Sequence, residues 1–323
     1  MKERQPTRAT APGKIILFGE HAVVYGRPAI AAPLAQIRAV ATIHPARSGG
    51  VILLAPDLGV ERSLADAEID DALALTVQQV REAAGLQRLP DMTIAVTSDI
   101  PIAAGLGSGA AITAAATRAL AHYLNLETWD SDEWVSALTY EVEKIHHGTP
   151  SGIDNTVVAY EQPVYFVRRE PQNIIETFNV QQPLRLLVGD TGISSSTKVV
   201  VGDVRCFWQQ DPQRFNALFD DCGAISEAGR EAIEKGAQQE IGRLMNENHA
   251  LLVDMTVSSP ELDTLVAAAL NAGALGAKMS GGGRGGNMIA LVTSGTEEAV
   301  RQALLAAGAV RVLESTIESR GVT

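Results

Sequence analysis

The chain has 323 residues, 46% of them hydrophobic, so it is long enough to form two ordinary domains or one large one around a sizeable core. Its 26 Lys and Arg residues against 38 Asp and Glu residues give a formal net charge of −12, which argues against a general nucleic-acid binder because such a protein needs a basic face. The two cysteines, Cys206 and Cys222, form neither a disulfide framework nor a metal-binding pattern, and this usage indicates a reduced, cytoplasmic compartment.

The N-terminal part is predicted to be rich in strands. Apolar runs separated by Gly, Pro and Asp predict strands over residues 14–18, 37–43 and 51–55. Within the segment APGKIILFGEHAVVYG, three polar side chains interrupt an otherwise apolar hairpin, namely Lys14, Glu20 and His21. Such groups beside a buried strand serve either a functional site or a structural ion pair, and the segment by itself favours neither.

A helix and a strand are predicted next. Leu73, Val77 and Val80 have helical spacing and predict a helix over 72–84, while alternation predicts a strand over 92–97. This strand leads into DIPIAAGLGSGAA, a glycine-rich turn that continues into an alanine-rich segment of helical pattern.

The glycine-rich turn has the composition of an anion site. Gly105, Gly107 and Gly109 allow backbone angles that other residues reach only at a cost, so that N–H groups can converge. The following helix adds free N–H groups and the positive end of its dipole, a combination suited to a polyphosphate. Ser108 places a hydroxyl there for a phosphate oxygen or a metal ion. The alternative is a tight turn packed under a helix of small residues.

The longest uncharged run, residues 100–117, lies in this region. It consists mostly of Ala, Gly, Ser and Thr, which contribute little transfer free energy, so it predicts a loop and a buried helix and no membrane span.

Two carboxylates in the segment EVEKIHHGTPSGIDN are candidates for chemistry. A helix predicted over 132–146 carries Glu143, and a turn with Pro150 and Gly152 presents Asp154 on new structure. Their spacing excludes one helix face, but a helix and the loop folding back beside it can bring them together. One would then hold a metal ion and the other would face an acceptor hydroxyl. Otherwise Glu143 is a surface residue and Asp154 a helix cap.

The second half is predicted to mix strands with long helices. Ser259 caps a further helix that has Pro260 in its first position. A domain change is expected near 160–185, and without strict alternation of strand and helix the chain is predicted to be α+β. The remaining predicted elements are strands over 164–167, 184–188, 276–280 and 288–293, helices over 198–209, 213–234 and 239–254, and a final helix and strand.

A second glycine-rich loop, GGGRGG at residues 281–286, matches GxGxxG, but a strand follows it where a dinucleotide site needs a helix. The P-loop signature is absent from the sequence. We expect this loop to form a second wall for phosphate or substrate. An anion loop with a hydroxyl, two acids and a lysine are the parts that phosphoryl transfer needs.

The chain resembles the GHMP kinase superfamily over nearly its whole length, and its first motif has the form found in mevalonate kinases, unlike the galactokinase form with Asp-Tyr in place of Val23 and Val24. Two departures stand out. The superfamily commonly has GLGSSAA, whereas this chain has GLGSGAA, with Gly109 in place of the second serine. The superfamily commonly has GAGGGG, whereas this chain has GGGRGG, in which Arg284 adds a guanidinium. That guanidinium either clamps a phosphate or carboxylate, or turns to solvent. The matching segments are PGKIILFGEHAVVYG, PIAAGLGSGAA, HGTPSGIDN, SSTK, LMNENHALL, SSPELD and GAKMSGGGRGG.

The resemblance implies a role for each matching residue. Ser108 and Glu143 would hold Mg²⁺ bound to ATP. Asp154 would orient or deprotonate the acceptor hydroxyl, and Lys14 would pair with it. The implied ATP-binding residues are Pro101, Ala104, Gly105, Leu106, Gly107, Ser108, Gly109 and Ala110. The implied substrate-binding residues are Lys14, Glu20, His21, Asp154, Thr197, Gly281, Gly282 and Arg284.

The resemblance also implies the GHMP kinase fold. Residues 1–170 would form a domain of the ribosomal protein S5 type and residues 171–323 a ferredoxin-like domain. The implied activity is ATP-dependent phosphorylation of the C5 hydroxyl of mevalonate, with neither nucleic acid nor membrane as partner and with a homodimer as the common assembly. The rivals are another kinase of the superfamily, such as one acting on phosphomevalonate, and a ligand-binding paralogue without catalysis. Loss of Lys14, Glu143 or Asp154 would favour the paralogue, but all three are present.

Overall fold

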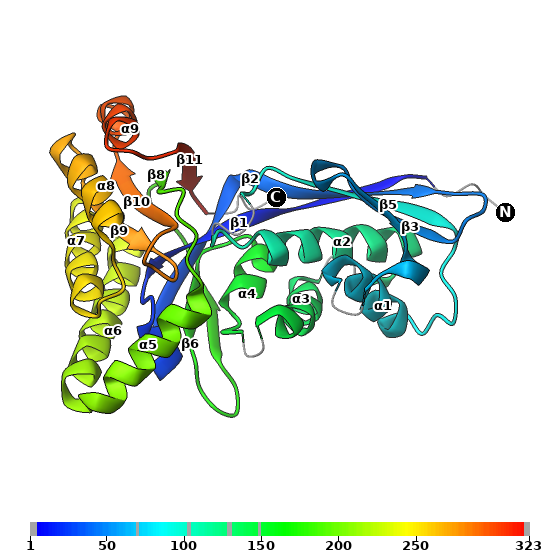
Figure 1. Ribbon diagram of the computed structural model, residues 1–323, viewed down its shortest axis with the longest axis horizontal. Coiled ribbons are helices and arrows are strands. Elements are labelled where there is room, and N and C mark those ends of the chain that lie inside the picture. Colours follow the sequence, from blue (N-terminus) through cyan, green and yellow to red (C-terminus); the bar gives the residue numbers. More distant parts are fainter. Residues whose placement is uncertain (1–4, 69–70, 102–104, 128–130, 148–149, 320–323) are drawn as a thin grey trace. The chain divides into compact units, whose positions relative to one another are not determined.

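The computed structural model describes residues 5–68, 71–101, 105–127, 131–147 and 150–319 (Figure 1). The chain divides into two compact units. The first comprises the described residues of Met1–Gly13, Ile37–Ile102 and Gly107–Glu161, and the second those of Lys14–Gln36, Ala103–Leu106 and Gln162–Thr323. The expected division after residue 170 treats each domain as one stretch of chain, whereas residues 14–36 group with the C-terminal part.

The first unit is a sheet covered on one face by helices (Figure 1). The strand order is β4 (Val60–Ser63), β3 (Val51–Ala55), β5 (Met92–Ser98) and the C-terminal part of β2 (Ala29–Pro45). Strands β3 and β5 are parallel, and β2 pairs antiparallel with β5, so that Ile43 lies opposite Ile94. Both isoleucines are fully buried, in agreement with the alternation that predicted β5.

Four helices belong to this unit, within its described residues: α1 (Ala72–Ala83), α2 (Ser108–Leu124), α3 (Asp132–His147) and α4 (Ile153–Tyr160). The alanines of α2 are buried on nearly every side because α1, α3 and α4 all pack against this helix. The predicted buried helix in this uncharged run is confirmed, and in the described part of the chain we find no helix that combines the length and apolarity needed to cross a membrane.

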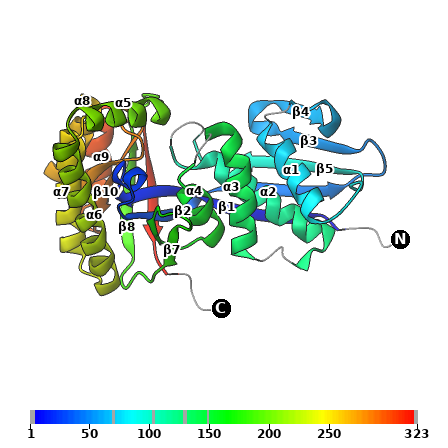
Figure 2. The same cartoon turned by 90° about the horizontal axis from the view of Figure 1, so that it is seen from below.

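The second unit contains a four-stranded antiparallel sheet in the order β11 (Arg311–Ile317), β8 (Leu184–Asp190), β10 (Asn287–Val292) and β9 (Gly276–Ser280). Helices α7 (Gln238–Asp254) and α8 (Pro260–Asn271) pack against β9, and α6 (Pro212–Lys235) packs on α7 (Figure 2). Helices α5 (Thr197–Gln210) and α9 (Glu297–Ala306) pack on α6 and α8 respectively. The core between these layers is apolar and includes Leu187, Phe219, Leu262 and Met279.

The N-terminal strands also contribute to this unit. β1 (Thr7–Phe18) is followed by a short 3-10 helix, Ala22–Tyr25, and β1 pairs with β2. The first residues of β2 pair with β6 (Val164–Val167), which pairs with β7 (Ile174–Thr177). The mixed α+β class is therefore confirmed, while β2 begins at Ala29, eight residues before the expected start.

Candidate active site

The start of α2 has the backbone of an anion site. Gly105 and Gly107, the N-cap of α2, both have a φ of 74°, in the left-handed region that favours glycine. Ser108 is the first helical residue, and because the N-cap is a glycine, no N-cap side chain accepts a hydrogen bond from the first N–H groups of the helix. The first N–H groups of a helix have no partner within that helix, so they are available to an anion. Ala104, which the resemblance places here, lies outside the described residues.

Gly109 is not demanded by packing. A Cβ atom at this position would meet nothing within 4 Å. The departure from the usual serine therefore leaves open space in the first turn of the helix.

Glu143 and Asp154 lie on helices that pack against each other and against α2. Glu143, on α3, is buried, at 7% exposure, so the reading of it as a surface residue is wrong. Asp154 lies in the first turn of α4, whose N-cap is Gly152, so the reading of it as a cap is also wrong. An anionic side chain in a first turn is favoured by the helix dipole.

Buried polar contacts fix these three helices to one another. Arg118 of α2 donates to the carbonyl of Ala159 on α4 at 2.6 Å and pairs with Asp132 at the start of α3. Asn155, next to Asp154, donates to the hydroxyl of Ser136 on α3 at 2.9 Å. Arg118 and Asn155 are both buried, where an unsatisfied hydrogen-bonding group is costly. Their hydrogen bonds therefore hold α2, α3 and α4 in one arrangement.

In the second unit, Glu20 forms a buried ion pair with Lys278 of β9. The ammonium of Lys278 also donates to the carbonyl of Met279 at 2.7 Å, and the side chains of Glu20 and Lys278 are 1% and 0% exposed. Burial raises the pKa of Glu20 and lowers the pKa of Lys278, while each charge opposes the shift of the other. Lys14, buried on β1, also acts to lower the pKa of Glu20.

His21 is held as a neutral ring. It is 5% exposed, and burial lowers its pKa to about 4. Nε2 lies 3.0 Å from the carbonyl oxygen of Gly282, which can only accept, so Nε2 carries the proton. Nδ1 is then an acceptor, and no hydrogen-bond partner reaches it among the described residues. A buried acceptor of this kind suits a substrate hydroxyl.

The glycine-rich loop 281–286 is built by close approach of backbone and side chains. A Cβ atom on Gly282 would lie 2.5 Å from the hydroxyl of Thr197, and one on Gly283 would lie 2.0 Å from the carbonyl oxygen of Val257. A Cβ atom on Gly285 would lie 2.5 Å from the carbonyl oxygen of Ile193. The loop thus has reasons for its glycines, and it brings Gly282, His21 and Thr197 together.

Arg284 takes neither of the two directions that the sequence left open. Its guanidinium pairs with Asp203 of α5, and its Nε donates to the carbonyl of Thr256 at 3.2 Å. Its charge is therefore engaged within the second unit.

The sequence-predicted residues consequently form two groups. The first unit holds Ser108, Glu143 and Asp154, and the second holds Lys14, Glu20, His21, Thr197, Gly281, Gly282 and Arg284. Sequence reasoning missed Lys278 and Asp203. A lysine within the otherwise apolar strand GAKMS was a signal for Lys278, since such a residue is almost never buried unpaired.

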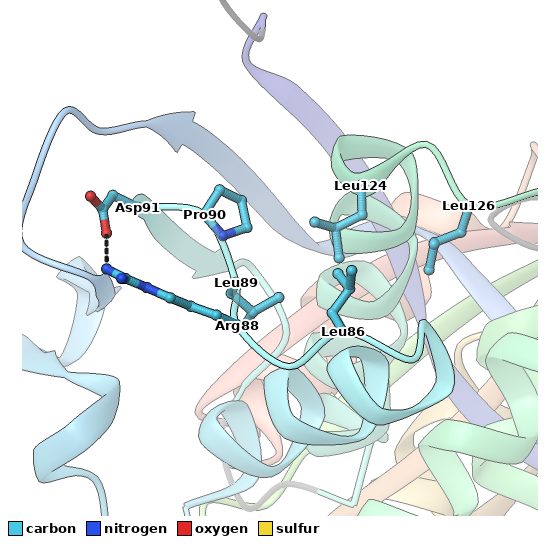
Figure 3. Close-up of a pocket in the computed structure, with 7 residues that line it drawn as sticks. All are labelled: Leu86, Arg88, Leu89, Pro90, Asp91, Leu124 and Leu126. Atoms are coloured by element: carbon cyan, nitrogen blue, oxygen red, sulfur yellow. Dashed lines mark ion pairs between the residues drawn. The ribbon is translucent and has the colours of Figure 1, made fainter.

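A separate surface pocket of about 470 Å³ lies in the first unit (Figure 3). Leu124 and Leu126 line it together with Leu86, Leu89 and Pro90, and Arg88 and Asp91 form an ion pair at 3.7 Å on its rim. Leu124 ends the helix that Ser108 begins. At a rise of about 1.5 Å per residue the pocket is roughly 24 Å from Ser108, so it is distinct from the candidate anion site.

Comparisons with known proteins match most of the chain. The sequence model described as the GHMP kinases N terminal domain matches residues 72–162, and the one described as GHMP kinases C terminal matches residues 230–310. Mevalonate kinases of Thermococcus sibiricus and Thermococcus onnurineus are each 37% identical to it, with 93% of both chains covered. The crystal structure of L. major mevalonate kinase in complex with R-mevalonate is 32% identical, with a TM-score of 0.83 and coverage of 96% of this chain and 95% of that one.

Proposed function

This chain belongs to the GHMP kinase family, and from that premise we propose that it transfers the terminal phosphoryl group of ATP to the C5 hydroxyl of mevalonate, giving 5-phosphomevalonate and ADP. The observation that carries the proposal is the match to mevalonate kinases over 93% of both chains, and the presence of Lys14, Glu143 and Asp154, to which we assign the chemistry, supports it. A net charge of −12 repels anions at long range, so the binding of ATP must depend on local features.

The start of α2 would bind the ATP phosphates through the N–H groups of residues 107–110 and the hydroxyl of Ser108. Magnesium fits the donor set offered by Ser108 and Glu143, because both supply oxygen and this ion normally takes its other ligands from phosphates and water. When bound, the cation neutralises charge on the transferred phosphoryl group. The burial of Glu143 at 7% exposure favours its pairing with a cation.

Asp154 would accept the proton of the C5 hydroxyl, or orient that hydroxyl for attack in line with the leaving ADP. Lys14 would stabilise the developing negative charge, since a nearby ammonium lowers the pKa of a hydroxyl. His21 would accept a hydrogen bond from substrate at Nδ1, and its low pKa keeps it neutral at physiological pH. These roles ask mainly for positioning and charge neutralisation.

A phosphomevalonate kinase is the main rival. It would favour extra positive charge in the substrate pocket, and Arg284 was the residue that could supply it. The pairing of Arg284 with Asp203 weakens that support. The resemblance further suggests a homodimer, which light scattering on the purified protein would test.

The decisive assay is ADP release from Mg·ATP with mevalonate, 5-phosphomevalonate, galactose or homoserine as acceptor, with Asp154→Asn as the matched control. We expect turnover with mevalonate and none above the control with the other three. Turnover with 5-phosphomevalonate alone would transfer the proposal to the rival. Turnover with none of the four would favour a ligand-binding paralogue.

A further inference from the structure

Arg284 occupies a backbone position made for glycine. Its φ is 54°, and four neighbours in the loop, Gly281, Gly283, Gly285 and Gly286, also have positive φ. An L-residue with a side chain is disfavoured in this region. The family motif has glycine here as well. The backbone conformation of Arg284 therefore costs conformational energy, which the contacts of its side chain can offset.

Those contacts all connect the loop to neighbouring elements. The guanidinium pairs with Asp203 on α5, and Nε donates to the carbonyl of Thr256 in the turn between α7 and α8. The backbone N–H of Arg284 donates to the carbonyl of Val257 in the same turn at 2.8 Å. The side chains of Arg284 and Asp203 are 32% and 43% exposed, so neither is a freely solvated charge.

The same loop holds the substrate-side residues. The carbonyl of Gly282 accepts a hydrogen bond from Nε2–H of His21, and Gly282 packs against the hydroxyl of Thr197, the first residue of α5. Asp203 lies on α5 as well. An ion pair from Arg284 to Asp203 therefore joins the two elements, loop and helix, whose relative position sets the distance from Gly282, the hydrogen-bond acceptor of His21, to Thr197.

We infer that the Arg284–Asp203 pair is a positioning device that holds loop 281–286 against α5 and so pre-forms the part of the pocket made by His21, Gly282 and Thr197. Arg284 in this arrangement is a positioning residue and does not bind substrate itself. The identity of the substrate rests on the proposed function, but the ordering of the loop does not.

Two isosteric or strain-free substitutions test the inference. Asp203→Asn removes the charge without changing shape, and Arg284→Gly suits the positive φ, so neither should impair folding. We expect each to raise the KM for mevalonate about three- to tenfold with kcat within about twofold, the cost of ordering a loop that is no longer pre-formed. The double variant should be no worse than either single one, because both remove the same contact. Glu231→Gln, which breaks an exposed pair on α6, is the matched control and should change neither constant.

Asp203→Asn separates positioning from direct binding. If Arg284 bound substrate, freeing it from Asp203 would leave KM unchanged or lower it, while Arg284→Gly alone would raise it; that pattern overturns the inference, and so does a KM unaffected by both variants. Hydrogen exchange in the protein without substrate is the second readout. Amides of residues 281–286 should exchange faster in both variants, and unchanged rates would overturn the inference. Because exchange needs no acceptor, a failure of the proposed substrate leaves this readout intact.

Discussion

The buried pair of Glu20 and Lys278 makes the sharpest prediction about stability. In Lys278→Met the ammonium is lost and the carboxylate of Glu20, 1% exposed, stays inside the second unit without its main partner. Removing one member of a fully buried pair typically costs about 3–5 kcal/mol, because the remaining charge has no solvent. For a folding unit of about 150–250 residues, 1 kcal/mol lowers Tm by about 2–4 °C, so we expect a fall of about 6–20 °C.

Differential scanning calorimetry of the purified variants would measure this change. The matched control is Lys235→Met, which breaks an exposed pair with Glu231 on the same unit and should leave Tm unchanged. The double variant Glu20→Gln/Lys278→Met should recover most of the loss, since a neutral pair of similar volume carries no desolvated charge. A fall no larger than that of the control, or a double variant as unstable as the sum of both singles, would refute the reasoning.

The pH dependence of the variant follows from the direction of the pKa shift. Burial already raises the pKa of Glu20, and removing Lys278 removes the largest influence that lowers it. A carboxyl group whose pKa is higher in the folded state than in the unfolded state destabilises the protein above its folded pKa, where both states would otherwise be ionised. This destabilisation is lost as the pH falls below the folded pKa towards the unfolded pKa. The deficit of Lys278→Met relative to the wild-type protein should therefore shrink as the pH falls from about 7 towards about 5.

Four further outcomes are expected. Asp154→Asn should lower kcat at least about 10²-fold, as loss of a general base does, with Tm unchanged; a kcat near that of the wild-type protein would remove Asp154 from the chemistry. Ser108→Ala should raise the half-saturating Mg²⁺ concentration about two- to tenfold, the value of one hydrogen-bond-like contact, and an unchanged Mg²⁺ titration would exclude its hydroxyl from the metal site. His21 has a folded pKa of about 4 against a usual 6.5, so the unfolded state takes up the proton first and stability should fall as pH drops through that window; in His21→Asn the acid side of the Tm profile should flatten. Gly283→Ala would place a Cβ atom 2.0 Å from the carbonyl oxygen of Val257 at a φ of +83°, so its Tm should fall, and a wild-type Tm would mean that the loop yields.

Local signals predicted most of the elements closely. Ser259 accepts from the N–H of Leu262 and Pro260 begins α8, as their spacing indicated. The strands over 51–55 and 164–167 have the predicted bounds. In these cases the physics lies within a few residues: a cap, a turn residue or an apolar run.

Elements without such a signal were missed. β7 is a short strand whose residues are mostly exposed, so its sequence has no alternating pattern. The first residues of β2 are buried on both faces and include Pro33. A continuous apolar run that contains a proline does not by itself predict a strand. The early start of β2 is thus a consequence of its tertiary pairing with β6.

The candidate site shows the same division. The sequence singled out Glu20 and left open whether it serves a site or an ion pair. Its partner, Lys278, lies 258 residues away, and the sequence contains no local signal that joins them. Arg284 was noticed as a departure from the family motif, but only the structure supplies Asp203 and the carbonyl of Thr256 as its contacts.

The grouping of residues 14–36 with the C-terminal part of the chain has a consequence for biosynthesis. This apolar segment leaves the ribosome early, yet its partners come late: Val164–Val167 for β2, Gly229 against the ring of Phe18, and Lys278 for Glu20. At about 5–20 residues per second, the 258 residues between Glu20 and Lys278 take about 13–50 s to translate. Throughout that time the carboxylate of Glu20 lacks its partner, and the hydrophobic strand lacks its own until Val164–Val167 have been translated. A fragment ending at residue 161 would leave this strand and this carboxylate permanently exposed. We therefore expect the isolated fragment to aggregate and to depend on chaperones.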